Sequence, residues 1–491
     1  MIPIVLRSDV PEPMAVQIAA EIRRLVAAGA LEPGQPVPSS RALASQLGVS
    51  RGTVVAAYDQ LVAESYLVAT PGGKTRIHPD TSARPVAASA GARPARRATT
   101  AAGMGLGGDH DRRESRPAQL DLTPHVHLPV VVDDSSWREA WRAAATPQQG
   151  AHSQPGESVQ GLAQLREAIA EHLRLMRSMV VDPADIFVTT GARDGLALVL
   201  AALGADSGPQ SAVGFESPGY PGLRRVMTRV GVEALPLAVD AQGLVASELP
   251  AAVGAILVTP NHLYPVGGSM PAPRRFELLA RAEGRGVLVI EDDLDSEYRH
   301  VGAILPSLWE LAPQSVVHLG TFNQVLTPDA RIGYLIAPAA LHAGLLAARG
   351  DLGSGASAIA QRAVASYLSG GGLRRHLIRR RREIVRRREV VSAALGEFGV
   401  QMNAGANAIV ELPSHAVSLD VQRSCAEVGV LVGDLGAYWN QPAQGPAQGP
   451  AQAPVAGIVI AYGGVDFGEL GPAVEVVARE VRRVIPLTPG S

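Results

Sequence analysis

Apolar residues recur at helical spacing near the start of the chain. One stripe lies on a single face of an expected helix: Met14, Ile18, Ile22, Leu25 and Val26. Two shorter helical patterns follow, and Gly48 separates them. Ser39 or Ser40 is expected to cap the first of these helices, and Ser50 the second, because a serine oxygen accepts a hydrogen bond from the first turn.

A helix, a short turn with glycine and a second helix form the layout of a helix-turn-helix, whose second helix enters the major groove of DNA. The following "YLVATPGGKTRIHP" predicts two short strands around a Gly-Gly turn, a wing. Arg41, Arg51, Lys74 and Arg76 are expected to project from the cap, the second helix and the wing. The alternative is a three-helix module that docks on protein, with solvated arginines.

From about residue 119 the pattern changes to apolar strands that alternate with helices. The strands are expected in "ADIFVTTG", "SAVGFES", "AILVTPNH", "GVLVIEDD" and "SVVHLGT". Strands alternating with helices predict a mostly parallel sheet, whose functional residues gather at the carboxyl ends of the strands.

Composition divides the chain into segments. Residues 1–80 form the winged helix-turn-helix, and 81–118, rich in Ala, Arg, Gly and Pro, form a flexible linker. Residues 119–491 form an α/β domain with a large part at about 150–345 and a smaller C-terminal α+β part at about 346–491. The low-complexity stretch 440–457 is expected to be a disordered loop.

Bulk properties exclude several classes of protein. The formal net charge is −2, so the whole molecule does not attract nucleic acid. The single cysteine, Cys425, excludes an intramolecular disulfide and a cysteine-rich metal cluster, and we expect it to be buried. Neither a long apolar run nor a signal peptide is visible, so we expect a cytoplasmic protein without membrane contact. No metal site is expected.

Several expected strand ends carry chemistry. The backbone N–H groups of Gly191 and Ala192 open a helix and could hold a phosphate, and Arg331 could clamp one. Asp292 ends an apolar strand, where it could pair with a protonated ring nitrogen or cap local backbone. Tyr220 could stack on a flat ring or serve core packing.

The segment "PSSRALASQLGVSRGTVVAAYDQLVAESYL" resembles the winged helix-turn-helix of GntR-type bacterial transcription regulators. The resemblance covers residues 10–78 and implies a double-stranded DNA operator as partner. It also implies contacts to phosphates or base edges from a defined set of residues, with the last two in the wing: Arg41, Ser50, Arg51, Thr53, Gly73 and Lys74.

The remaining motifs resemble the fold-type-I aminotransferase domain, and with the first domain they resemble the MocR subgroup of GntR regulators. They are "GLAQLREAIAEHL", "TTGARDG", "ESPGYPG", "TPNHLYPVGG", "IEDDLDSEYR" and "GTFNQVLTPDARIGYL". In that family a lysine holds pyridoxal phosphate (PLP) as a Schiff base. By the resemblance, Tyr220, His262, Asp292 and Arg331 match cofactor-binding positions.

The departures from the family pattern concern the same site. The Schiff-base lysine falls at Gln324, and the only lysine of the chain, Lys74, lies in the expected wing. The tyrosine near the cofactor's phenolic oxygen falls at Leu294, the serine before the lysine at Asn323, and a substrate-gripping arginine near Val459. A further family tyrosine is replaced by Gly156. An amide cannot form an imine.

These features together predict a transcription regulator with a catalytically inactive aminotransferase-like domain and no covalent cofactor. Either PLP or another phosphorylated ligand binds non-covalently, or the pocket has changed to another small-molecule effector or to none and serves dimerisation. Two other classes of protein stay open. One is an aminotransferase enzyme that carries a DNA-binding domain, and the other is a structural scaffold on DNA. The resemblance implies a homodimer in which the DNA-binding arm of one subunit packs on the large domain of the other, an exchange that the long linker permits.

Two arginine-rich stretches remain open. The expected helix at 373–391 either touches DNA or presents a solvated face that pairs with acidic neighbours. The linker arginines are a similar case: Arg84, Arg93, Arg96, Arg97, Arg112, Arg113 and Arg116.

Overall fold

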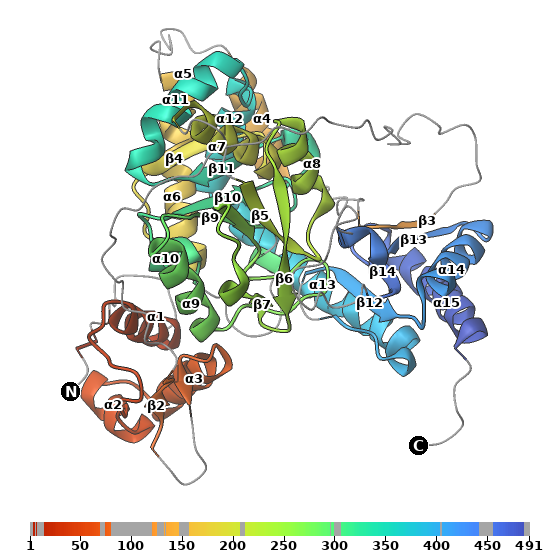
Figure 1. Cartoon of the computed structure of the whole chain (residues 1–491), viewed down its shortest axis with the longest axis horizontal. Coiled ribbons are helices and arrows are strands. Elements are labelled where there is room, and N and C mark those ends of the chain that lie inside the picture. Colours follow the sequence, from red (N-terminus) through yellow and green to blue (C-terminus); the bar gives the residue numbers. More distant parts are fainter. Residues whose placement is uncertain are drawn as a thin grey trace.

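A computed structural model of the chain describes residues 14–68, 74–79, 120–124, 134–146, 157–206, 212–294, 296–298, 306–402, 405–440 and 455–485, together with residues 3, 4, 6 and 132. The predicted linker at 81–118, Gly73, Gly156 and residues 441–454 of the predicted loop lie outside the described residues. Figure 1 shows a small N-terminal domain, a large central domain and a small C-terminal domain.

The N-terminal domain is a winged helix-turn-helix, as predicted. It consists of α1 (Met14–Ala27), α2 (Ser40–Leu47), α3 (Arg51–Ala63), β1 (Leu67–Val68) and β2 (Arg76–Ile77). Ser39 caps α2 by accepting from Ala42 N, and Gly48 ends it at φ 67°, a conformation that suits glycine. Ser50 caps α3 by accepting from Thr53 N at 3.1 Å. The strands β1 and β2 pair antiparallel and form the wing.

An eight-stranded sheet forms the centre of the large domain, in the order β4-β11-β10-β9-β8-β5-β6-β7. Its strands are β4 (Ile186–Thr189), β5 (Ala212–Ser217), β6 (Ala234–Asp240), β7 (Gly243–Leu244), β8 (Val253–Val258), β9 (Leu288–Asp293), β10 (Val316–Thr321) and β11 (Gly333–Ile336). The five central strands β10, β9, β8, β5 and β6 run parallel, and the pairs at β11 and β7 are antiparallel. The prediction of a mostly parallel sheet is confirmed.

Helices cover both faces of this sheet. They are α4 (Ser135–Ala145), α5 (Glu157–Gln160), α6 (Ala163–Arg177), α7 (Ala192–Asp206), α8 (Pro221–Arg229), α9 (Ala272–Glu283), α10 (Leu308–Leu311), α11 (Ala339–Leu352) and α12 (Ala358–Ser369). One apolar core lies under α7 and α8, and a second lies under α6 and α12. Because α11 packs on α7 and α12 packs on α6, the large domain extends beyond the predicted boundary near 345.

The small domain follows the long helix α13 (Gly372–Leu395). Its sheet has the order β12-β14-β13-β3, from β12 (Asn407–Glu411), β14 (Gly457–Ala461), β13 (Val430–Asp434) and β3 (Leu120–Leu122), with α14 (His415–Glu427) and α15 (Phe467–Val484) packed on it. The sequence did not predict β3, which pairs parallel to β13. The strand β14 begins at Gly457, inside the predicted loop. Cys425 is buried, as predicted.

Single-turn 3-10 helices complete the described elements: η1 (Pro183–Asp185), η2 (Ala246–Glu248), η3 (Ser296–Tyr298), η4 (Pro328–Ala330), η5 (Gly396–Phe398) and η6 (Leu435–Tyr438). In the part of the chain that the structure describes, we find no helix that is both long and apolar enough to cross a membrane.

Candidate DNA-binding surface and ligand site

The basic residues predicted to contact DNA lie on the exposed surface of the winged helix-turn-helix. Arg41, Arg51, Lys74 and Arg76 are all exposed. Arg51 Nε approaches Ser40 Oγ at 3.4 Å, and Arg76 donates to Gly34 O at 3.0 Å. Each of these contacts uses one guanidinium nitrogen, so further donors are left for phosphate or base contacts.

Ser50 and Thr53 stand at the start of α3 and already have local partners. Ser50 Oγ caps the helix, and the two hydroxyls lie 2.8 Å apart in a hydrogen bond. Capping of this kind is worth about 1 kcal/mol. Their contact with DNA remains a prediction, and the structure adds a second role, which is to hold the first turn of α3.

The candidate ligand site lies at the carboxyl edge of the central strands. Glu216 and Asp292 are the last residues but one of β5 and β9, and Gln324 follows β10. The turn after β4 contains Gly191, and the loop after β8 contains His262. This edge is where ligands bind in open α/β sheets.

Two buried carboxylates interact at this edge. Asp292 is 3% exposed, and so is Glu216. Glu216 Oε2 accepts hydrogen bonds from Thr259 N at 2.9 Å and Thr259 Oγ1 at 2.5 Å, and Oε1 has no hydrogen-bond partner among the described residues. Burial raises the pKa of Glu216 to about 7 against the hydrogen bonds from Thr259, and the charge of Asp292 adds to the rise.

Glu216 was missed in the sequence. Its position in the sequence could have predicted it. Glu216 stands at the polar end of the apolar strand β5, and Asp292 stands at the polar end of the apolar strand β9. An acidic residue at the end of a buried strand lies at the ligand edge of the sheet, whichever strand it ends.

Gln324 lies where the large and small domains meet. Tyr298 donates its hydroxyl to Gln324 O at 2.6 Å. A cavity of about 50 Å³ lies beside Gln324, lined by Pro124, Tyr264, Leu294, Tyr298, Gln324, Ala406, Asn407, Ala461, Gly463 and Gly464. Small-molecule pockets occupy roughly 300–1,000 Å³, so this cavity accepts a few waters and no ring.

Asn323 braces the turn that would receive a phosphate. Its side chain donates to Thr190 O at 3.0 Å and accepts from Ile332 N at 3.1 Å. Gly191 has φ +132°, and a Cβ there would lie 2.7 Å from Asn323 Nδ2. Gly191 N donates to Thr189 Oγ1 at 3.2 Å, so this N–H group, predicted to hold a phosphate, already has a partner.

Charged side chains surround the same turn. Arg331 is exposed and adopts a left-handed conformation, with φ 47°. Arg193, in the first turn of α7, donates to Tyr220 OH at 2.7 Å and lies over its ring. Asp194 accepts from Thr190 N at 2.9 Å and pairs with Arg349 at 3.1 Å. Arg193 therefore adds a positive charge at the start of α7, where Asp194 opposes an anion, and contact of Arg331 with an anion remains a prediction.

Aromatic and apolar side chains close the other side of the site. The Tyr264 ring packs edge-on against Tyr220 at 5.6 Å, Tyr438 at 5.5 Å and His262 at 5.9 Å. Val459 belongs to the same apolar cluster and is fully buried. An amino-acid carboxylate placed here would lose its hydration without gaining a cation.

Backbone contacts join the two domains at this cluster. Gly219 N donates to Tyr438 O at 3.1 Å, and Asn440 N donates to Ser217 Oγ at 3.1 Å. Both bonds connect the segment after β5 with the small domain, so the domains are closed over the site.

PLP fits this site at its two charged ends and not at its reactive end. Arg331, Arg193 and the start of α7 suit a phosphate, and the buried carboxylate of Asp292 suits a protonated ring nitrogen. Gln324 supplies an amide where an imine needs an amine. The described residues contain no group of three or more His, Cys, Asp or Glu side chains placed to hold a metal ion.

Many arginines of α13 have partners within the chain. Arg379 pairs with Asp134 at 3.3 Å, Arg380 and Arg387 pair with Glu383, and Arg381 donates to Glu297 O. These contacts favour the structural interpretation for those residues. Others, such as Arg374 and Arg382, are exposed, and contact of α13 with DNA remains a prediction.

Comparison with known proteins gives two family matches. Residues 14–77 match bacterial regulatory proteins of the gntR family, and residues 135–438 match aminotransferase class I and II. The structure resembles LysN, an alpha-aminoadipate aminotransferase from Thermus thermophilus, with a TM-score of 0.63 and 23% identity over 74% of this chain and 92% of that chain. At this identity the likeness shows the fold alone.

Two bacterial regulators match most of the chain. The HTH-type pyridoxine biosynthesis transcriptional regulator PdxR of Corynebacterium glutamicum is 43% identical over 89% of this chain and 91% of its own length. The HTH-type transcriptional regulator TauR of Rhodobacter capsulatus is 32% identical over 85% of this chain and 88% of its own. The chain therefore belongs to the MocR- and PdxR-type GntR regulators, DNA-binding proteins that carry an aminotransferase-like domain.

Proposed function

We propose that this chain is a regulator that binds a double-stranded operator as a homodimer, and that its aminotransferase-like domain binds an effector without covalent chemistry. One observation carries the second part of the proposal. The only lysine, Lys74, lies in the wing, and the strand edge presents Gln324 instead. The strand edge therefore contains no lysine that could form a Schiff base.

The absence of transaminase activity follows from what the reaction needs. Transamination uses a lysine amine both as the covalent anchor and as the carrier of protons. The amide nitrogen of Gln324 is not basic and cannot take either role. Leu294 offers no hydrogen bond to a phenolic oxygen, and buried Val459 offers no charge to a substrate carboxylate.

The effector we propose is a phosphorylated pyridine of the PLP type. When bound covalently in enzymes, PLP supplies an electron sink. Here Arg331 and the start of α7 would hold the phosphate, Asp292 would pair with the ring nitrogen, and Tyr220 would flank the ring. The name of the regulator from Corynebacterium glutamicum, which refers to pyridoxine biosynthesis, supports the choice of this ligand.

A second candidate is a different effector or none, with the domain serving dimerisation. The cavity of about 50 Å³ beside Gln324 favours it, because a ring needs the two domains to separate. Glu216 also favours it, since above its raised pKa of about 7 this buried carboxylate adds a negative charge at the edge that repels an anionic ligand.

Restoring the lysine tests the proposal. With PLP and borohydride, Gln324→Lys is expected to gain the absorbance and the mass of one reduced pyridoxyl adduct at residue 324, because the rest of the site suits the cofactor. Peptide mapping of the wild-type protein is expected to find no adduct at the strand edge. An adduct there in the wild type, or amine transfer by it, would contradict a non-covalent effector domain.

A further inference from the structure

The winged helix-turn-helix is seated on helix α9 of the large domain. Ala272 and Phe276 are buried in the apolar core of the N-terminal domain, and the Phe276 ring packs edge-on against Tyr66 at 6.1 Å. Figure 1 shows α1 and α3 beside α9, far from the small domain. Leu311 of α10 packs against the same core, so the contact is made mainly by α9 with a contribution from α10.

The contact joins the end of the DNA-recognition helix to the start of α9. Ala272 N, the first amide of α9, donates to Glu64 O, the C-cap of α3, at 3.2 Å. The negative end of one helix thus meets the positive end of the other. Arg23 fixes the Glu64 carboxylate with bonds of 3.1 and 2.8 Å. The position of α3 is therefore tied to that of α9.

Docking leaves the DNA-binding surface uncovered. Arg41, Arg51 and Lys74 stay exposed in the docked structure. The contact therefore orients the recognition helix without blocking it.

One turn into α9, Arg275 is buried with 1% exposure, and its hydrogen bonds go to three carbonyls and one amide. It donates to Met270 O at 2.8 Å, Pro306 O at 2.6 Å, Pro260 O at 2.8 Å and Asn261 Oδ1 at 2.9 Å. Pro260 and Asn261 directly precede His262 of the ligand site. One side chain thus connects the helix that seats α3 to the loop that borders the ligand.

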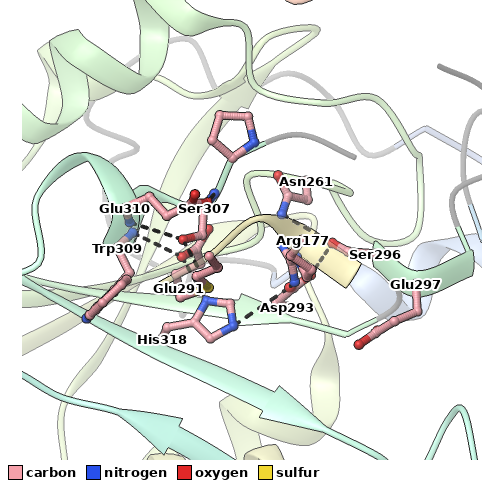
Figure 2. A network of polar contacts seen from close by, with 12 residues as sticks. Arg177, Asn261, Glu291, Asp293, Ser296, Glu297, Ser307, Trp309, Glu310 and His318 are labelled. Atoms are coloured by element: carbon pink, nitrogen blue, oxygen red, sulfur yellow. Dashed lines mark hydrogen bonds and ion pairs between the residues drawn. The ribbon is translucent and has the colours of Figure 1, made fainter. Parts of the chain in front are cut away.

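The loop is joined in turn to the strand that carries Asp292. Figure 2 shows Asn261, Ser296 and Asp293 side by side, and Asn261 Nδ2 donates to Ser296 Oγ at 3.2 Å. Ser296 donates to Asp293, which also pairs with Arg177. On β9, Asp293 directly follows Asp292, so the polar network reaches the backbone next to the carboxylate of the ligand site, while the two side chains point to opposite faces of the sheet.

We infer that Arg275 is the positioning residue that couples the ligand site to the seat of the recognition helix. A ligand that moves the 260–262 loop or the end of β9 shifts the acceptors of Arg275, and α9 carries that shift to Glu64 and α3. Coupling is reciprocal, so undocking the N-terminal domain must also loosen the loop. The ligand half of this inference rests on the proposed function, and the reciprocal half does not.

Hydrogen–deuterium exchange on the full-length protein without ligand tests the reciprocal half. Ala272→Arg places a charged side chain in the seat and undocks the N-terminal domain. We expect exchange of the amides at 262–270, several of which are hydrogen-bonded within this loop, to rise roughly fivefold or more. In an Arg275→Gln background the same undocking is expected to leave that exchange unchanged. Equal effects in both backgrounds, or no effect in either, would overturn the inference.

PLP is the probe for the ligand half. We expect PLP to slow exchange of the amides at 64–68 and 272–283 in the wild-type protein. Arg281→Gln, a control on the exposed face of α9, should show the same slowing. Arg275→Gln should bind PLP with unchanged affinity and show no slowing. Protection that persists in Arg275→Gln would refute the coupling. If calorimetry shows no PLP binding to wild type, the proposed ligand fails, and the ligand-free experiment still decides the role of Arg275.

Folding is controlled separately, because loss of a buried guanidinium can unfold α9. Arg275→Lys keeps a buried cation that cannot reach all four acceptors. We expect it to stay folded, with a melting temperature lowered less than in Arg275→Gln, while it loses at least half of the coupled change in exchange. Full coupling in Arg275→Lys would assign the effect to charge alone and contradict the positioning role.

Discussion

At the scale of single residues, Gln324 decides what the ligand site can do. The site keeps a buried carboxylate at Asp292 and exposed cations at Arg193 and Arg331. Those groups recognise charge and need no covalent anchor. In the proposed function, one amide in place of an amine replaces covalent catalysis by recognition, and the charged groups keep the role of recognising the ligand.

Substitution of Arg51 gives the most direct test of DNA binding. If it reads a base, Arg51→Ala should weaken binding to an operator obtained by in vitro selection by roughly 1–3 kcal/mol. Fluorescence anisotropy at fixed salt measures this, with Arg281→Ala as the control because Arg281 lies on the large domain. An unchanged affinity would remove Arg51 from the interface.

Glu216 predicts a pH dependence of stability. Its folded pKa of about 7 lies above the ordinary value of 4.5, so between these values the folded protein keeps a proton that the unfolded chain releases. Protonated Glu216 therefore contributes on the order of 3 kcal/mol to the free energy of unfolding below pH 4.5. This contribution is lost as the pH rises to about 7.

Glu216→Gln isolates this contribution because the amide does not titrate. The melting temperature of wild type minus that of the variant should fall between pH 5 and 7 and level off above that range. Differential scanning calorimetry across this range measures the difference. A constant difference would mean that Glu216 titrates as an ordinary exposed carboxyl.

At the scale of elements, the turn between β4 and α7 depends on glycine. Gly191 adopts φ +132°, and a Cβ there would meet Asn323 Nδ2 at 2.7 Å. Gly191→Ala should destabilise the protein by about 1–3 kcal/mol, since it combines a strained backbone with a steric contact.

Gly350→Ala is the matched control for this substitution. Gly350 lies in α11, and a Cβ at this position would have no other atom within 4 Å, so alanine there should stabilise by about 0.5–1 kcal/mol. Denaturant midpoints compare the two variants. A neutral Gly191→Ala would show that the turn relaxes at no cost.

Local patterns predicted most elements, and long-range contacts account for those they did not predict. Gly48 and Ser50 mark the helix ends of the winged helix-turn-helix, because caps are signals within a few residues. The strand β3 was not predicted because its partner β13 lies some 300 residues later in the chain, and three residues carry too little pattern of their own. Arg275 could not be placed either, since its acceptors come from separate segments.

At the scale of the whole molecule, the large domain makes two interdomain contacts, and one of them lies at the ligand site. The small domain closes on the segment after β5 through Gly219 and Asn440, and the N-terminal domain closes on α9 through Ala272. A ligand that enters between the large and small domains must disturb the first closure. The polar network through Arg275 connects that disturbance to the second closure.

The lysine content of the chain allows the central claim to be tested by one titration. Lys74→Arg removes the only lysine, and so every lysine to which PLP could attach. Calorimetric titration with PLP is expected to give the same Kd for wild type and for Lys74→Arg, and a Kd raised at least tenfold for Arg331→Ala (about 1.4 kcal/mol). No binding to wild type, or binding lost in Lys74→Arg, would contradict a regulator that senses PLP without covalent chemistry.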